Sequence, residues 1–218
     1  MRRAASTKIC CMTVTTLSFD QLVEIVSVLT DAFHDYPVMQ YVLGPDMPGA
    51  AAPYGVRLHR LVQLFASGRA YRDEPMFGVR DAKGALIGAA VMTLPASPSP
   101  RPAFIALRES VWAELGADAR ARYDGYMSSA QFFASQGPHH HLNMIGVRRA
   151  HQHRGIAREL LAEAHRLAKG DPQSAGVSLT TERAANVPFY EHFGYRVVGH
   201  NRVSADLETW GLFRGRDG

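Results

Sequence analysis

The second half of the chain alternates strand-like and helix-like segments, and this alternation limits the folds open to it. An apolar, strand-like stretch at 139–147 is followed by a helical pattern at 155–169 and then by a second strand pattern at 177–182. Two strands joined by a helix usually pair in parallel, because the crossover carries the chain back to the edge where it started. The pattern therefore predicts an α/β or α+β sheet with parallel pairing near its centre.

The first half supplies further elements around that centre. Apolar residues at helical spacing predict helices over 19–33 and 54–68. Two β patterns flank the turn at 81–84, and a pattern punctuated by proline and glycine at 34–49 predicts a connecting segment. The first half thus adds helices and antiparallel strands rather than a second domain.

A proline-rich loop at 95–102 introduces a helical stretch at 104–136. Prolines at that density exclude both a helix and a sheet ladder in the loop. The helical stretch has the length of one or two helices, which is too short for a separate core. We expect one domain over 1–218, with a helical insertion at about 95–136 packed on the main sheet.

Composition narrows the class of protein further. The chain has 218 residues, is 46% hydrophobic and carries a formal net charge of +4, which suits a globular domain that binds an anionic ligand. Its two cysteines, Cys10 and Cys11, are adjacent and close no useful loop. No apolar run reaches the roughly 18 residues of a membrane span, and no secretory signal is recognisable, although a transit peptide stays open. We expect a cytoplasmic protein that binds neither membrane nor nucleic acid.

A basic turn joins the strand at 139–147 to the helix that follows. Like charges repel, so six basic side chains around one turn favour a strongly anionic ligand over a merely solvated loop. The first turn of the helix adds unpaired backbone N–H groups, and Gly155 lets a ligand approach them closely. The six residues are Arg148, Arg149, His151, His153, Arg154 and Arg158.

The segment Gln152–Ala157 reads Q-x-x-G-x-A, and neither a Walker nor a Rossmann glycine pattern is present. It resembles the acetyl-CoA signature of the GCN5-related N-acetyltransferase (GNAT) family. Asparagine, tyrosine and Gly-Tyr within 186–195 look like the family's second half-motif. The segment at 32–46 and the helical insertion resemble the puromycin N-acetyltransferase-type branch.

The resemblance implies a mixed, mostly antiparallel sheet of six to seven strands, with a central splayed parallel pair and flanking helices. It also implies acetyl-CoA as the acetyl donor, with the pantetheine arm along the strand edge and the Val147 amide at the thioester oxygen. Arg154 and Arg158 would contact the pyrophosphate from the sides. The implied cofactor-binding residues are Ile145, Gly146, Val147, Gln152, His153, Arg154, Gly155, Ile156, Ala157, Arg158 and Asn186.

The same resemblance places the chemistry. Tyr190 is one helical turn after Asn186 and would protonate the departing thiolate, with ordinary aromatic packing as the alternative. For the base we name His141, because strand alternation would put it on one face with Ile145 and Val147, together with residues 139 and 143. A water chain is an alternative base, and Glu182 is expected to be a cap or a surface residue.

The sequence departs from the branch at three positions. Arg149 stands where the branch usually has proline, His153 where it has glycine, and Thr180 where it often has an acid. The histidines at 139–141 lack the companions that a metal site needs, so no metal is expected. The predicted function is acetyl transfer to a small-molecule amine by direct attack in a ternary complex. A non-catalytic acyl-CoA sensor and an acetyltransferase of protein N-termini or lysines stay open, as does the choice between monomer and homodimer.

Overall fold

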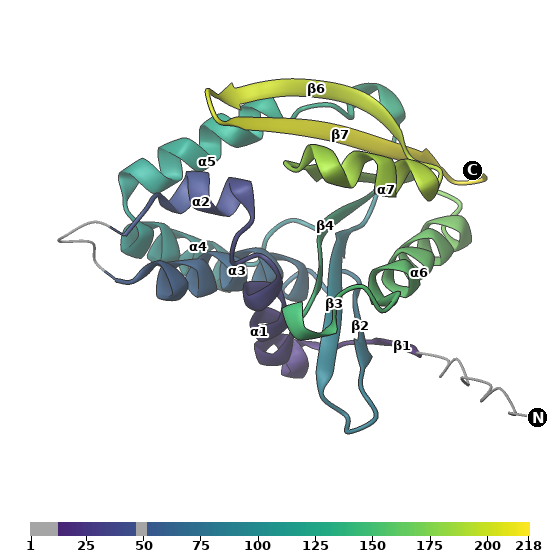
Figure 1. Ribbon diagram of the computed structural model, residues 1–218, viewed down its shortest axis with the longest axis horizontal. Helices are drawn as coiled ribbons and strands as arrows, with labels where there is room; N and C mark the ends of the chain where they lie inside the picture. Colours follow the sequence, from purple (N-terminus) through teal and green to yellow (C-terminus); the bar gives the residue numbers. More distant parts are fainter. Residues whose placement is uncertain (1–12, 47–51) are drawn as a thin grey trace, which may run out of the picture.

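A seven-stranded open sheet forms the centre of the computed structural model, which describes residues 13–46 and 52–218 (Figure 1). The strand order is β1-β2-β3-β4-β5-β7-β6, and every neighbouring pair is antiparallel except β4 and β5. This confirms the predicted fold class, including its single parallel pair. The cysteines and the basic start of the chain lie outside the described residues. The strands are β1 Val14–Thr16, β2 Met76–Arg80, β3 Leu86–Thr93, β4 His140–Val147, β5 Gly176–Thr181, β6 Arg196–Ser204 and β7 Leu207–Gly215.

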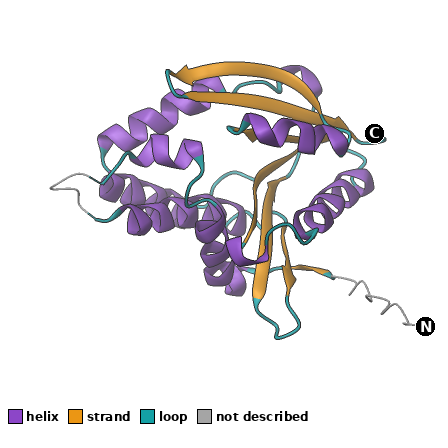
Figure 2. Ribbon diagram, viewed as in Figure 1, coloured by secondary structure: helices purple, strands orange, loops and turns teal. Residues whose placement is uncertain are grey.

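Helices cover both faces of this sheet (Figure 2). Residues 89–92 of β3 pack alternately into two apolar clusters, one containing α1 and α3 and the other containing α6, as expected for a strand buried on both faces. The helices are α1 Leu22–Ala32, α2 Pro37–Leu43, α3 Tyr54–Ala70, α4 Pro102–Leu115, α5 Ala117–Ser129, α6 Ile156–Gly170 and α7 Val187–His192. Short 3-10 turns lie at Phe19–Gln21, Ala134–Gln136, Arg149–His151 and Ala184–Asn186.

The segment after α1 contains a helix where the sequence predicted only a connection. Pro37 occupies the first turn of α2, where its missing N–H costs no hydrogen bond. Gly44 ends the helix with φ 68°, and its N–H donates to Gln40 O at 2.8 Å. The proline and the glycine therefore mark the two ends of a short helix. Part of the segment, 47–51, lies outside the described residues.

The helical insertion is present as α4 and α5. Helix α4 packs on α3 and α5, and α5 packs on α2 and against β6. Tyr126 of α5 also contacts Thr180 of β5, so the insertion lies partly on other helices and partly on the sheet. The extent of the domain, 1–218, stays a prediction.

Phe132, which follows α5, fixes the insertion to the β6–β7 hairpin. Its ring lies over Gly199 and Gly211, where an added Cβ would come within 2.2 Å and 2.4 Å of ring carbons. Nearby, the Asn201 side chain donates to Ser129 O at 2.7 Å. Because Gly199 on β6 and Gly211 on β7 have no side chains, the two strands leave a slot that accepts the Phe132 ring.

Gly211→Ala is expected to destabilise the protein by about 1–3 kcal/mol, because the methyl group overpacks this slot. Gly125→Ala on α5 is the matched control: no atom lies within 4 Å of its Cβ, so we expect a gain of about 0.5–1 kcal/mol. Chemical denaturation of both variants measures the difference. Equal stability of Gly211→Ala and the parent would show that Phe132 does not rest there.

Candidate active site

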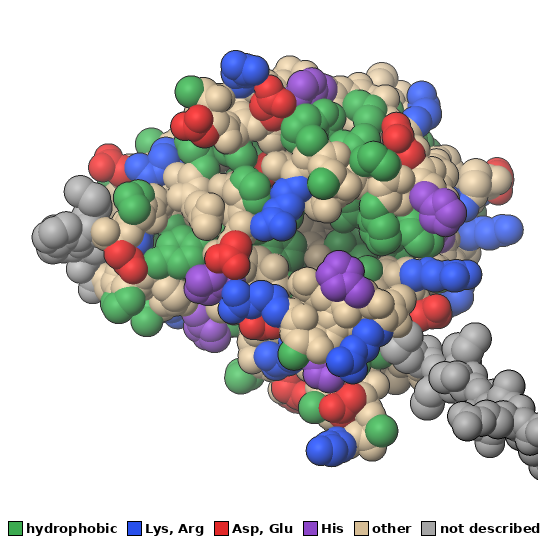
Figure 3. Space-filling model, viewed as in Figure 1, with side chains coloured by type: hydrophobic (Ala, Val, Ile, Leu, Met, Phe, Trp, Pro, Cys, Tyr) green, Lys and Arg blue, Asp and Glu red, His purple; other side chains and the backbone are tan. Residues whose placement is uncertain are grey.

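The parallel pair opens into a gap shortly after it forms. Strands β4 and β5 are paired only at His140–Val177 and His141–Ser178, and they separate beyond that point. This is the predicted splayed pair. A cavity of about 630 Å³ adjoins the gap and is lined by the segment after α1, by α2 to α5, by α7 and by the diverging ends of the two strands. Figure 3 shows the molecule hollowed where Figure 1 places β4 between α1 and α7.

A bulge in β4 changes which side chains share a face. Val91 pairs with Met144 and Met92 with Leu142, so Asn143 is the extra residue. Leu142, Ile145 and Val147 consequently pack into the α6 cluster, whereas Met144 packs into the α1–α3 cluster. The prediction that residues 139, 141, 143, 145 and 147 share one face is therefore wrong, because one inserted residue reverses the alternation.

The backbone of β4 presents two amides to the gap. The Arg148 N–H donates to Ile87 O on β3 at 2.9 Å, and alternate residues of a strand turn the same way. The amides of Ile145 and Val147 therefore face away from β3, toward the gap. Gln152 Nε2 donates to Val147 O at 3.2 Å, which ties the following turn to the strand end.

The turn before α6 has the backbone path of a ligand-binding loop. His153 has φ 61° and Gly155 has φ 82°, so both residues adopt the left-handed conformation that glycine favours. No side chain caps α6, which leaves its first-turn amides free at the positive end of the helix dipole.

Only part of the basic cluster is available to a ligand. Arg149 forms ion pairs with Asp31 and Asp35, each at 3.3 Å. Arg148 donates to Leu86 O at 2.9 Å and to Ser27 Oγ at 3.0 Å. These two arginines hold α1 and β3 in place. Arg154 and Arg158 are exposed, so they are the arginines free to contact an anion.

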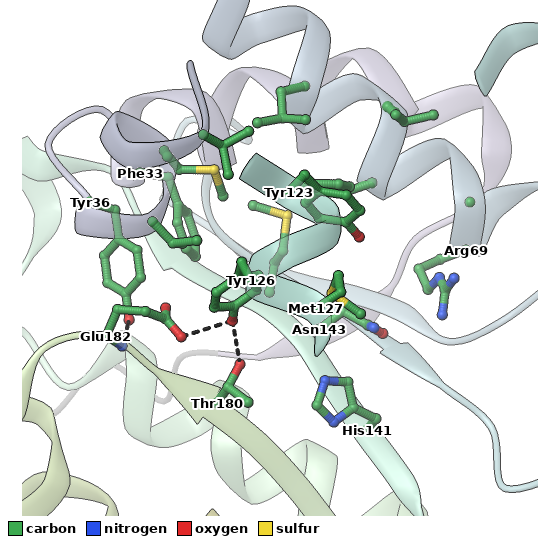
Figure 4. Close-up of a pocket in the computed structure, with 18 of the residues that line it drawn as sticks. Phe33, Tyr36, Arg69, Tyr123, Tyr126, Met127, His141, Asn143, Thr180 and Glu182 are labelled. Atoms are coloured by element: carbon green, nitrogen blue, oxygen red, sulfur yellow. Dashed lines mark hydrogen bonds between the residues drawn. The ribbon is translucent and has the colours of Figure 1, made fainter. Parts of the chain in front are cut away.

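Glu182, just beyond β5, lines the cavity as a buried carboxylate. Its side chain accepts hydrogen bonds from Tyr126 at 2.8 Å and from Thr209 at 2.9 Å, both at Oε1. The residue is only 8% exposed, and burial raises the pKa of its carboxyl to about 7. The expectation of a cap or surface residue is wrong, because α5 covers this strand end (Figure 4). The sequence held no signal for that cover.

Tyr190 on α7 also lines the cavity and is buried. Its ring packs edge-on against Phe189 and Tyr195, at centroid distances of 5.3 and 5.8 Å. Burial, followed by the nearby charge of Glu182, raises the pKa of its phenol well above 10. The hydroxyl therefore carries its proton at neutral pH and can donate it. Asn186 lines the same cavity and donates from Nδ2 to Thr181 Oγ1 at 3.0 Å.

His141 lies at the point where the two strands separate. Its Nδ1 is 2.7 Å from Ser178 Oγ, and burial lowers its pKa to about 4. The imidazole is thus neutral at pH 7 but weakly basic, and a base works best when its pKa is close to the working pH. Glu182 meets that condition better, although the role of His141 stays a prediction.

The comparisons with known proteins agree with this geometry. A family model described as "Acetyltransferase (GNAT) domain" matches residues 118–210, the part that contains the gap, the turn and α7. Residues 118–210, less than half of the chain, are thus similar to a GNAT acetyltransferase domain. The match supports an acetyl-CoA-dependent acetyltransferase. No curated protein sequence matches the chain.

Solved structures resemble this chain over nearly its whole length. One, described as "histone acetyltransferase HPA2 and related acetyltransferase" from Corynebacterium glutamicum, has a TM-score of 0.62 and 17% identity, and covers 94% of this chain and 96% of its own. Arylalkylamine N-acetyltransferase 2 from Aedes aegypti has a TM-score of 0.61 and 13% identity over 93% and 97%. The ribosomal-protein-S18-alanine N-acetyltransferase from Escherichia coli has a TM-score of 0.55 and 14% identity over 94% and 93%. At such low identity these similarities show the fold alone.

The backbone of the site fits acetyl-CoA. The free amides of Ile145 and Val147, together with the uncapped start of α6, are the donors that a pantetheine arm and a pyrophosphate require. Within the described ranges no three His, Cys, Asp or Glu side chains converge on one metal position. Nor does any helix in those ranges combine the length and apolarity needed to cross a membrane.

Proposed function

We propose that the protein transfers the acetyl group of acetyl-CoA to the amine of a small molecule held in the 630 Å³ cavity. The observation that carries this proposal is the buried Glu182 carboxylate, whose pKa of about 7 suits a base at neutral pH. The covering helices α4 and α5 line the cavity, and such enclosure favours a compact acceptor over a protein side chain. The resemblance to the puromycin-type branch supports the same kind of acceptor.

Acetyl-CoA would be held by three groups of residues. The amides of Ile145 and Val147, with Gly146 between them, face the gap along the strand edge, and the first-turn amides around Gly155, Ile156 and Ala157 are suited to the pyrophosphate. Gln152, His153, Arg154, Arg158 and Asn186 complete the predicted set. When bound, acetyl-CoA supplies an acetyl group activated as a thioester.

The residues around the gap then have distinct tasks. Glu182 accepts a proton from the acceptor's ammonium, which makes its nitrogen nucleophilic. The N–C bond would form and the C–S bond would break, with the nitrogen releasing its second proton to solvent and the Val147 amide stabilising the negative oxygen. Tyr190 donates its proton to the departing sulfur, and exchange with solvent restores both groups.

A thiol-release assay tests this function. Acetyl-CoA is incubated with the protein and with a panel of arylalkylamines, aliphatic amines and short peptides with free N-termini, and free thiol is measured. We expect turnover with small amines and little with peptides. Turnover with peptides alone would indicate a protein acetyltransferase. Calorimetric binding of coenzyme A without any turnover would indicate a sensor.

A further inference from the structure

The cavity has an acidic end and a basic end. Figure 4 shows Glu182 and Arg69 on opposite sides of it, with Tyr126 between them. Arg69 comes from the last turn of α3, and the cavity is also lined by three further arginines and by a second, exposed carboxylate: Arg72, Arg108, Arg120 and Asp124. An acceptor bearing only a positive charge would meet a suitable partner at one end of this space and repulsion at the other.

Arg69 is held in place by a buried polar chain. Its Nε is 3.2 Å from Glu74 Oε2, and the Glu74 side chain is fully buried. Its Nη1 donates to Thr93 Oγ1, which in turn donates to Asn143 Oδ1 at 2.8 Å. The guanidinium therefore points in a fixed direction at little further entropic cost.

The remaining nitrogen of Arg69 is available to a ligand. In 13–46 and 52–218, Nη2 has no hydrogen-bond partner. Arg72 is oriented beside it by hydrogen bonds to Gly68 O at 2.7 Å and Pro98 O at 2.9 Å. Within the same residues Arg72 joins no ion pair, so its charge adds to that of Arg69.

Between the two charged ends the wall is apolar and aromatic. Leu64, Phe65, Trp112, Tyr123 and Met127 line this part, and the Phe65 and Tyr123 rings stack at a centroid distance of 5.3 Å. Such a wall favours a hydrocarbon or aryl body and offers it few polar partners.

We propose that the acceptor is an amphipathic amino acid whose amine and carboxylate lie at opposite ends of an apolar body, and that Arg69 binds the carboxylate while Glu182 meets the amine. This inference rests on the proposed acetyl transfer and adds the acceptor class. Arg69 is a specificity-determining residue in this scheme, because it contacts the part of the acceptor that does not react.

Matched acceptor pairs test the proposal. Para-aminomethylbenzoate and longer aminoalkylbenzoates are each compared with their primary amides, which keep the shape and lose the charge. For the length that spans the cavity, we expect kcat/KM to be about 10- to 100-fold higher for the acid, as for a charge-assisted hydrogen bond. The difference should lie mainly in KM, since the carboxylate takes no part in the chemistry.

Variants assign the preference to Arg69. The double variant Arg69→Gln/Glu74→Gln removes both buried charges together, which avoids leaving Glu74 unpaired. In this double variant, kcat/KM for each acid should be close to kcat/KM for the matching amide. Arg60→Gln is the control: it lies on the same helix but pairs with Glu114 at 2.5 Å outside the cavity, and it should preserve the preference for the acid. Thermal unfolding of each variant checks folding.

The two possible failures are distinguishable. Thiol release that is equally fast with acids and amides, in both the parent and the double variant, would overturn the assigned acceptor class and leave acetyl transfer standing. Absence of thiol release with every amine would overturn the proposed function, and this inference with it.

Discussion

Glu182→Gln is expected to lower kcat by about 10²- to 10⁴-fold, the usual contribution of a general base. In the parent protein the rate should rise with pH through about 7, as the Glu182 carboxyl loses its proton. The variant keeps the shape of the side chain but cannot accept a proton, so its residual rate should lack this rise. Steady-state kinetics between pH 5.5 and 8.5, a span chosen about that pKa, measure both effects.

The free energy of unfolding of Glu182→Gln shows whether a loss of activity comes from loss of the base or from loss of the fold. Because the folded state raises the pKa of Glu182, the folded protein holds this proton more tightly than the unfolded chain. The stabilisation is complete below the ordinary carboxyl pKa of 4.5 and is lost as the pH rises through about 7. Glu182→Gln should therefore be more stable than the parent at pH 8, by about 3 kcal/mol at most.

A matched carboxylate provides the control for Glu182. Glu191 is exposed on α7, close to the site in sequence but outside the cavity, and Glu191→Gln should leave both kcat and the pH profile unchanged. Full activity in Glu182→Gln would remove this residue as the base and return the role to His141 or to a water chain.

Tyr190→Phe is the second change with a large expected effect. Removing the hydroxyl leaves the ring packing in place, so the affinity for coenzyme A should stay nearly the same. The thiolate would then leave without a proton, and kcat should fall by about 10²- to 10³-fold. Calorimetry with coenzyme A and single-turnover kinetics separate binding from chemistry.

Tyr195→Phe is the control for the tyrosine. The Tyr195 hydroxyl is 3.1 Å from His165 Nε2 and does not line the cavity. Its loss should therefore leave kcat unaffected. Unchanged turnover in Tyr190→Phe would show that solvent, rather than this phenol, protonates the sulfur.

Periodic patterns predicted much of the fold because they depend on local geometry. The helix at 155–169 and the strand at 139–147 correspond to α6 Ile156–Gly170 and β4 His140–Val147. The bulge at Asn143 was not predicted, since a bulge depends on the register with β3 rather than on the strand's own residues. One added residue was sufficient to turn His141 away from the face of Ile145.

In the candidate site, too, one part could be predicted from the sequence and another could not. The turn at 152–157 was predictable, because a phosphate-binding loop is contiguous in sequence and needs special backbone angles. Glu182 was not, since its burial comes from Tyr126 on α5 and Thr209 on β7, both distant in the chain. The pKa of a carboxyl is set by its surroundings, and these exist only after folding.

The position of Phe132 has a consequence for how this molecule could diversify. The cover of the cavity, 102–129, is one uninterrupted length of chain that is clamped at its far end by a ring between two glycines. The donor side is built from strands elsewhere. Exchanging that single length for a homologous one, with the clamp and Tyr126 retained, should change which molecules are acetylated while Glu182 and the donor side remain as they are.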